Sequence, residues 1–316
     1  MSSEETKLPE TNEQTEVRSQ LDQQTDLIIP LFRRDIKPSN LVLSASDLRE
    51  FAELISEAND RSREIEFQKR EAESFETDED ARKHIKQLMP IEYRYVEKNG
   101  NSAEGLGVPN VDERTFPEDM NTIFISNASF AERAVNRRPG NTVEAFIAFD
   151  RPTLKMDLIT LPSNPTENRS VINVAGNDEA WVIATYEKIK EFFAKKRATR
   201  PVIHGSGAYD SFIYFLFLPS LLWVFFKSSG AAMTQWINAQ TVFFNVLIAI
   251  YVLLLFLLIG RFLFQYIRWL FPPMEYYKKS KTVSGLHRAT AGLVLSAIFL
   301  SALYDILRHL LFAVIL

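Results

Sequence analysis

Long runs of apolar residues fill the C-terminal third of the chain, whereas apolar and polar positions recur in short patterns before it. About 20 consecutive apolar residues are needed to cross the hydrocarbon core of a bilayer. The runs predict three membrane helices, at about 208–227, at 239–262 with a continuation to 271, and at 289–316. Buried helices of a soluble protein are the alternative, but no soluble part is large enough to cover three of them. We therefore predict a transmembrane region over 208–316, entered through a linker at 201–207.

Residues 27–200 show the patterns of a folded domain with helices near its start and at its end. Apolar residues that recur every three or four positions indicate amphipathic helices. Three such helices are predicted: one capped by Ser46 that buries Leu48, Phe51, Ile55 and Ala58; one capped by Thr77, with Ala81, Ile85 and Leu88 inward, that stops at Pro90; and one that starts at Gly176 and Asn177, buries Trp181, Val182, Thr185, Ile189 and Phe192, and runs to Arg197.

Five short segments of this domain are rich in β-branched and aromatic residues, as strands are. They lie at 91–96, 121–126, 142–149, 154–161 and 170–174. The tetrapeptide at 150–153 joins two of them as a turn, which predicts a hairpin. Clustered strands with short turns, together with the helices, indicate an α+β fold with a mainly antiparallel sheet.

The C-terminal third of the chain is basic, whereas the part before it is acidic. Residues 208–316 carry eight Lys and Arg against three acids, a net charge of +5, so the remainder carries −9 of the total of −4. Residues 1–26 are polar and acid-rich, and we expect a disordered acidic tail. They contain no apolar stretch of the kind found in signal peptides, so the domain at 27–200 is expected to stay cytoplasmic. The absence of cysteine excludes disulfides and thiolate chemistry.

Lys and Arg are concentrated on one side of the predicted spans. The residues Lys195, Lys196, Arg197 and Arg200 precede the first span, and the loop between the second and third spans is also basic. Because positively charged loops stay in the cytoplasm, we expect a multi-pass protein of the cell membrane with its soluble domain inside and its C-terminus outside. Trp269 would then mark the inner headgroup level, where aromatic residues accumulate.

Motifs of catalysis and of metal or nucleotide binding are missing from the sequence. The histidines His84, His204, His287 and His309 are scattered, without the spacing of a zinc site. Ser206 lies in the linker, which is no place for a nucleophile elbow, and there is neither a P-loop nor a dinucleotide fingerprint. We therefore predict that the protein is not an enzyme and needs neither a metal ion nor a cofactor.

Arg133, Arg137 and Arg138 form the one compact basic cluster of the acidic domain. Guanidinium groups bind phosphates through paired hydrogen bonds. The cluster is therefore a candidate site for an anionic ligand such as a nucleotide or a nucleic acid. A solvated loop, or a contact with anionic lipid, is the other interpretation.

Polar residues inside the predicted spans are functional candidates because they are costly in lipid. Asn245, in the middle of the second span, would make an interhelical hydrogen bond or join a polar ring in a pore. Arg261, Gln265 and Arg268 follow at helical spacing on its cytoplasmic continuation. They would contact headgroups in a monomer, or form a positively charged mouth in a ring of subunits.

The third predicted span has a polar face of its own. Ser301, Asp305 and Arg308 share one side of that helix, and His309 lies four residues after Asp305. Small residues such as Ser301 allow helices to pack closely. This face would line a pore, or form a salt-bridged cluster near the outer interface.

The layout resembles that of bacterial anti-phage membrane effectors of the CBASS and Hailong types. The resemblance rests on the basic stretch from Lys195 to Arg200, on the spans from Ser211 onward, and on the intramembrane Asp305 and Arg308. It implies antiviral defence at the bacterial inner membrane, with a cytoplasmic sensor domain that responds to a nucleotide or an oligonucleotide and opens an oligomeric channel.

A homo-oligomeric membrane effector or ion channel with a cytoplasmic regulatory domain is the function we predict. Three spans in one chain are too few to enclose a water-filled path, so transport requires several copies. A membrane-anchored scaffold without a pore is the alternative, and a membrane-bound enzyme that uses carboxylates of the sheet is a third hypothesis. The expected partners are the lipid bilayer, further copies of the chain, and an anionic ligand.

Overall fold

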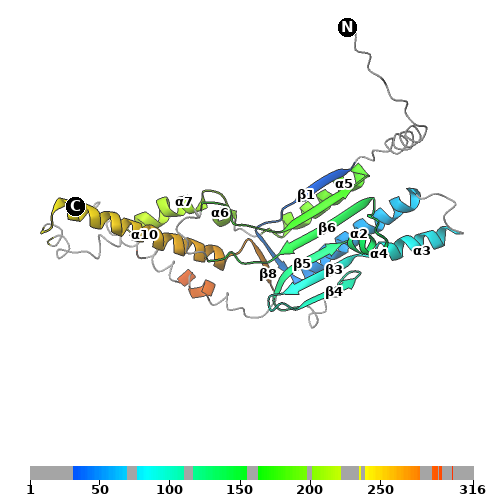
Figure 1. Ribbon diagram of the computed structural model, residues 1–316, viewed down its shortest axis with the longest axis horizontal. Coiled ribbons are helices and arrows are strands. Elements are labelled where there is room, and N and C mark those ends of the chain that lie inside the picture. Colours follow the sequence, from blue (N-terminus) through cyan, green and yellow to red (C-terminus); the bar gives the residue numbers. More distant parts are fainter. Residues whose placement is uncertain are drawn as a thin grey trace, which may run out of the picture.

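The computed structural model shows a sheet domain from which a long apolar helix projects (Figure 1). The residues that it describes are 31–69, 77–109, 117–154, 163–197, 201–221, 235, 239–277, 287–290, 292–293 and 301. The predicted tail at 1–26, the expected strand at 154–161 beyond its first residue, and most of the third predicted span lie outside this part of the chain.

Six strands form one sheet in which every neighbouring pair is antiparallel. Their order across the sheet is β1-β7-β6-β5-β3-β4. The strands are β1 (Phe32–Ile36), β3 (Glu92–Glu97), β4 (Ser102–Leu106), β5 (Met120–Ser126), β6 (Asn141–Ala148) and β7 (Val171–Gly176). The predicted α+β class with a mainly antiparallel sheet is therefore confirmed.

Four helices accompany this sheet, and three of them were predicted. The long helices α2 (Ala45–Lys69) and α5 (Glu179–Lys195) pack against its inward side chains. The shorter helix α3 (Asp78–Leu88) contacts α2 and α4 (Ser129–Val135). Helix α4 was not predicted because its seven residues are too few to show a helical period.

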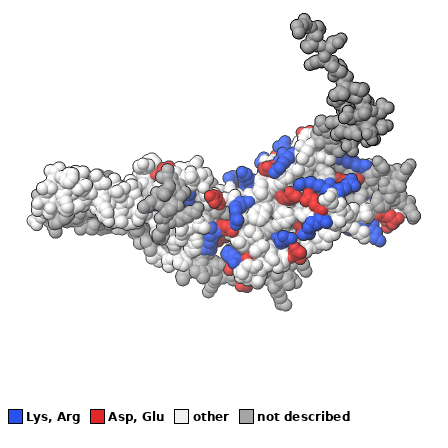
Figure 2. Space-filling view, viewed as in Figure 1, with Lys and Arg blue, Asp and Glu red and all other residues white. Residues whose placement is uncertain are grey.

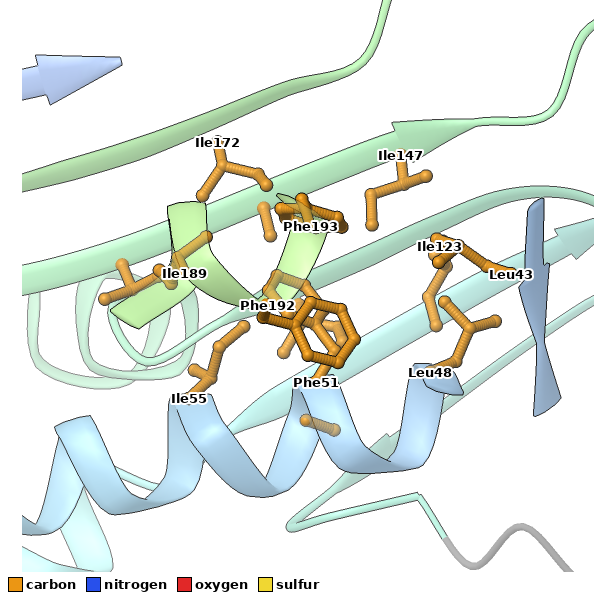
Figure 3. Close-up of a cluster of buried hydrophobic side chains, with 14 of the residues drawn as sticks. Leu43, Leu48, Phe51, Ile55, Ile123, Ile147, Ile172, Ile189, Phe192 and Phe193 are labelled. Carbon is orange, nitrogen blue, oxygen red and sulfur yellow. The ribbon is translucent and has the colours of Figure 1, made fainter. Parts of the chain in front are cut away.

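The hydrophobic core lies between the sheet and the helices α2 and α5. Phe51 is fully buried, and its ring centroid lies 5.5 Å from that of Phe192 and 5.1 Å from that of Phe193 (Figure 3). Ile123 and Ile147 approach from the adjacent strands β5 and β6 (Figure 3). The apolar stripes read from the sequence are therefore the ones that the helices bury.

The start of α2 differs from the prediction. The helix begins at Ala45, so Ser44 rather than Ser46 is its cap. The Ser44 hydroxyl accepts a hydrogen bond from the Asp47 N–H at 3.2 Å, and the Asp47 carboxylate accepts one from the Ser44 N–H at 2.8 Å. This reciprocal pair is a capping box, with Asp47 in the position that Glu more often takes.

Two other helix starts depend on single side chains. Thr77 caps α3 as predicted, because its hydroxyl accepts the Asp80 N–H at 3.1 Å. Helix α5 starts later than predicted: Asp178 is its cap and accepts the Trp181 N–H at 2.9 Å, so Gly176 still belongs to β7.

Among the described residues, one helix is long and apolar enough to cross a membrane, namely α10 (Val242–Leu270). The second predicted span and its continuation are therefore a single helix, roughly 44 Å long at 1.5 Å per residue. Thr241 caps it by accepting the Phe244 N–H at 3.4 Å, and it ends before Pro272. A module of three membrane helices is not shown by this part of the chain.

The first predicted span is described over its first half, which packs on α10. It consists of α7 (Ala208–Ser211) and the π-helical segment η2 (Phe212–Phe217). A Cβ atom at Gly260 of α10 would lie 2.7 Å from the Phe217 ring. Glycine at this position therefore permits the close approach of the two segments.

After α10 the chain returns to the sheet domain. Strand β8 (Met274–Tyr277) pairs in parallel with β2 (Leu41–Ser44) over four residue pairs, and together they form a second, two-stranded sheet. Neither strand was predicted from the sequence. Helix α10 thus lies between two segments of the chain that belong to the sheet domain.

Candidate functional site

The end of α10 is built into the sheet domain, and we call this region the junction: residues 201–204, 268–277 and Arg288. The Leu41 N–H donates a hydrogen bond to the Pro273 carbonyl at 3.0 Å. Met274 is only 1% exposed and belongs to the same hydrophobic core as Phe51. A residue that follows α10 therefore completes the hydrophobic core of the sheet domain.

Arg268 lies at the centre of the junction and is 7% exposed. Its Nε donates to the Ile203 carbonyl at 3.1 Å and its Nη1 to the Asn164 carbonyl at 2.9 Å. The guanidinium also lies 4.7 Å from the centroid of the Phe264 ring. Both predicted roles, headgroup contact and vestibule lining, are wrong for Arg268 because its side chain is enclosed by the protein.

His204, in the segment predicted as a linker, makes a hydrogen bond to the end of α10. Its Nε2 donates to the Phe271 carbonyl at 2.6 Å, and its Nδ1 is 2.9 Å from the Thr166 hydroxyl. The Thr166 N–H in turn donates to the His204 carbonyl at 3.2 Å. Residues 201–204 form helix α6 (Pro201–His204), so this half of the expected linker is structured and fixed in place.

Arg288, which follows β8 along the chain, contacts both the end of α10 and β8. Its Nε and Nη2 donate to the Leu270 carbonyl at 3.0 and 2.9 Å, and Nη2 is 2.7 Å from a carboxylate oxygen of Glu275. The last carbonyls of a helix lack intrahelical partners and carry partial negative charge. Arg288 and His204 supply donors to two of these carbonyls, which stabilises the end of α10.

Tyr276 fixes β8 to the sheet domain. Its hydroxyl donates to the Pro117 carbonyl at 3.2 Å, and its ring centroid lies 5.7 Å from that of Phe149. Burial raises the pKa of Tyr276 to about 12. The phenol therefore stays protonated, and able to donate this hydrogen bond, throughout the physiological range.

The predicted anion site is largely neutralised by the domain itself. Arg133 lies 2.7 Å from a carboxylate oxygen of the buried Glu92, and Arg138 lies 3.2 Å from one of Glu144. Arg137 is exposed and forms no ion pair within the described ranges. Two of the three arginines already have carboxylate partners in the domain, which argues against a site for an anionic ligand.

The basic stretch before the first span also serves the domain. Lys196 lies 2.6 Å from Asp47 and 3.0 Å from Glu50, which ties the end of α5 to the start of α2. Lys195 pairs with Glu191 on the surface of α5. Arg197 forms an isolated antiparallel bridge with Leu41, and Arg200 lies outside the described residues. Lys196 is thus occupied by carboxylates of the domain, and the cytoplasmic position predicted for this basic stretch stays a prediction.

The remaining intramembrane candidates are described only in part. Asn245, Arg261 and Gln265 lie on α10, each neither fully buried nor fully exposed. Ser301 is helical and exposed. Asp305, Arg308 and His309 lie outside the part of the chain that the structure describes. Their proposed role in a pore stays a prediction.

Ligand chemistry at the junction is limited by its residue types. The parts of the chain that the structure describes contain no group of three His, Asp or Glu that could hold a metal ion. The polar side chains of the junction are mostly hydrogen-bond donors that already bind backbone carbonyls. This arrangement can transmit a displacement between the sheet and α10 because it fixes their relative position.

The junction could not be predicted from the sequence because its two strands, β2 and β8, lie more than 200 residues apart in the chain. One local signal was present: Met274 and Tyr276 alternate with Glu275 and Tyr277 directly after the prolines, which is a strand-like pattern. No family model matches this chain, and no curated protein or solved structure matches it either.

Proposed function

We propose that the protein is a homo-oligomeric membrane effector in which a cytoplasmic α+β domain controls ion passage through helices that include α10. One observation carries this proposal: the end of α10 is fixed in the junction by strand pairing, by the core residue Met274 and by the buried Arg268. A helix that only anchored the domain would need no such attachment.

The junction gives the domain a mechanical hold on the membrane helix. A shift of β2 moves β8 with it, because the two strands share backbone hydrogen bonds along their length. Helix α10 is continuous from Val242 to Leu270, so a displacement of its last turn tilts or translates the whole rod. Packed elements of this kind change between discrete arrangements rather than deforming gradually.

Several copies are needed for a pore, and the surface of α10 supports their association. Its outer part leaves large apolar side chains exposed, among them Phe243, Tyr251 and Leu254. Figure 2 shows this end of the molecule as an almost uncharged surface, in contrast to the charged sheet domain. Such a surface requires lipid or other helices around it. Two further spans per chain, cytoplasmic placement of the domain and an external C-terminus belong to the same proposal.

A membrane-anchored scaffold without a pore is the second candidate, and one observation favours it. Helix α10 carries no charged side chain before Arg261, and Arg268 is withdrawn into the junction. Asn245 alone would provide strong polarity in the middle of a pore formed by this helix. Pore polarity would then have to come from the third predicted span.

Ion flux from liposomes, measured together with the oligomeric state, tests the proposal. We expect the full-length protein to form a defined oligomer that conducts ions. Replacement of 242–259 by leucines keeps an apolar span and the junction, and it should abolish or strongly reduce this flux. Flux that is unchanged by the replacement would show that α10 is only a tether and would favour the scaffold.

A further inference from the structure

An arginine of the sheet domain lies over the aromatic residues at the end of α10. The Arg151 guanidinium is 4.8 Å from the centroid of the Trp269 ring. That ring is stacked on Tyr266, with centroids 5.8 Å apart, and meets His287 edge-on at 6.2 Å. The Tyr266 hydroxyl lies 3.0 Å from Nδ1 of His287. We call Tyr266, Trp269 and His287 the aromatic cradle.

Within the part of the chain that the structure describes, no carboxylate neutralises the charge of Arg151. The adjacent acid, Asp150, forms its ion pair with Arg169 and not with Arg151. In the described ranges of the chain, Arg151 takes part in no salt bridge, unlike the partly buried Arg63 and Arg288. Its guanidinium donors are therefore available to an anion from outside.

Position distinguishes Arg151 from Arg34, an arginine that lies over a ring elsewhere in the domain. Arg34 lies 5.4 Å from the centroid of the Tyr186 ring, but this contact joins β1 to α5 and is part of the sheet domain. Arg151 instead meets the last turn of the helix that is apolar enough to cross a membrane. Trp and Tyr rings accumulate at the headgroup level of a bilayer, so the cradle fits the boundary between lipid and water.

The chemistry of this pair matches a phospholipid headgroup. A guanidinium offers a planar set of donors that suits two oxygens of one phosphate. The cradle holds this group by a cation–π contact, which also leaves its edge free to donate. The rings beside it provide the apolar surface that the glycerol backbone and the first methylenes of a lipid need.

We propose that Arg151, held over the Trp269 ring of the aromatic cradle, binds the phosphate of an anionic phospholipid headgroup in the inner leaflet. The site rests on the proposed membrane function because it requires that α10 end at this leaflet. It would fix the depth of the junction in the bilayer and make the position of the sheet domain sensitive to lipid charge.

Lipid retention by the full-length protein tests the site. Delipidated protein in a neutral detergent is titrated with phosphatidylglycerol or phosphatidylcholine, and bound lipid is counted by native mass spectrometry. Glycerol 3-phosphate and inorganic phosphate serve as soluble sources of the same anion. The variants are Arg151→Gln, Arg151→Lys and the matched control Arg34→Gln, which removes the same charge from an arginine over a different ring.

We expect preferential retention of phosphatidylglycerol, weakened about tenfold by Arg151→Gln, the effect of one lost charged hydrogen bond. Arg151→Lys should recover part of the loss, and Arg34→Gln should behave as the wild type. Equal retention in Arg151→Gln and Arg34→Gln would overturn the proposal. Binding of the soluble phosphates at similar concentrations would overturn the lipid assignment and point to a free anion.

The outcome is separable from that of the proposed function. Selective lipid retention by a protein that passes no ions would support this site and contradict the channel. Ion flux that is indifferent to Arg151→Gln, together with unselective lipid binding, would contradict the site and leave the channel standing.

Discussion

Helices α5 and α10 are both rich in aromatic and aliphatic residues, yet they use them differently. Helix α5 buries one stripe, including Trp181 and Phe192, and turns its charged residues outward. Helix α10 is apolar on all sides over its outer part, and only near its end are side chains such as Phe264 and Leu270 buried. Helix α5 therefore has one face in solvent and one in the core along its whole length. Helix α10 instead changes along its length, from an apolar exposed surface to side chains buried in the protein.

The comparison shows where α10 changes from an exposed apolar surface to a buried one. Up to Gly260 the helix has the composition of a span, and from Arg268 onward it behaves as part of the sheet domain. The change occurs within about two helical turns. A boundary inside one continuous helix couples the two regions more firmly than a linker between them would.

The core of the sheet domain should show the largest effect of a single substitution. Phe51→Ala removes a fully buried ring from between α2 and α5, and we expect a loss of about 3–5 kcal/mol of unfolding free energy. Ile183→Ala is the control on α5, since Ile183 is 38% exposed and should cost well under half as much. Chemical denaturation followed by near-UV circular dichroism measures both, and similar losses would contradict the assigned core.

Met274 sharpens the comparison because it follows α10 along the chain and yet lies in the core of the sheet domain. Met274→Ala should destabilise the sheet domain by about 2–3 kcal/mol, as expected for a buried methionine. Leu254→Ala on the outer part of α10, where Leu254 is 59% exposed, should leave the sheet domain unchanged. If both substitutions had the same small effect, β8 would not belong to the core.

Arg268 tests whether the junction is held by polar contacts as well. Arg268→Gln is too short to reach the Ile203 and Asn164 carbonyls, and unsatisfied buried acceptors cost about 1–2 kcal/mol. Amide hydrogen exchange over 201–207 should therefore accelerate. Arg261→Gln is the matched control, and equal acceleration in both variants would argue against a specific role for Arg268.

The ion pair of Asp47 and Lys196 should give a small dependence of stability on pH. Burial alone would raise the pKa of Asp47, but the hydrogen bonds from Lys196 and Ser44 outweigh it and lower this pKa below 3.8. A lowered pKa means that the stabilisation is complete above about pH 4 and is lost as the pH falls further. Asp47→Asn should remove roughly 0.5–1 kcal/mol at pH 7.

The control for this pH effect is the exposed pair of Glu191 and Lys195. Glu191→Gln should change stability less than Asp47→Asn, because solvent screens a pair on the helix surface. Stability is measured by thermal unfolding between pH 3 and pH 7. A wild type whose acid sensitivity equals that of Asp47→Asn would show that the pair is not formed.

Elements with a strong local signal were predictable from the sequence. The stripe from Trp181 to Phe192, the cap at Thr77 and the strand at 142–149 all follow from spacing or side-chain chemistry, and the structure confirms them. The edge strands were not predicted. β1 reads FRRDI and β4 reads SAEGL, and neither shows a regular alternation of apolar residues.

The site could be predicted only as a list of unusual residues. Helical spacing placed Arg261, Gln265 and Arg268 on one side of a helix, but spacing cannot say what that side faces. The partner of Arg268 is the backbone of Ile203 and Asn164, and carbonyl groups leave no mark in a sequence. The pairing of β2 with β8 is equally invisible, because no local pattern links segments so far apart.

Ion flux from liposomes that contain an uncoupled variant tests the central claim most directly. The variant carries a four-residue Gly-Ser insertion between Phe271 and Pro272 together with Arg268→Gln, which frees α10 while both strands stay intact. The same insertion after Asn99, in the exposed turn between β3 and β4, is the control. We predict that flux differs between the wild type and the uncoupled variant and that the control matches the wild type. Identical traces from all three proteins, whether conducting or silent, would contradict control of the membrane helices by the sheet domain.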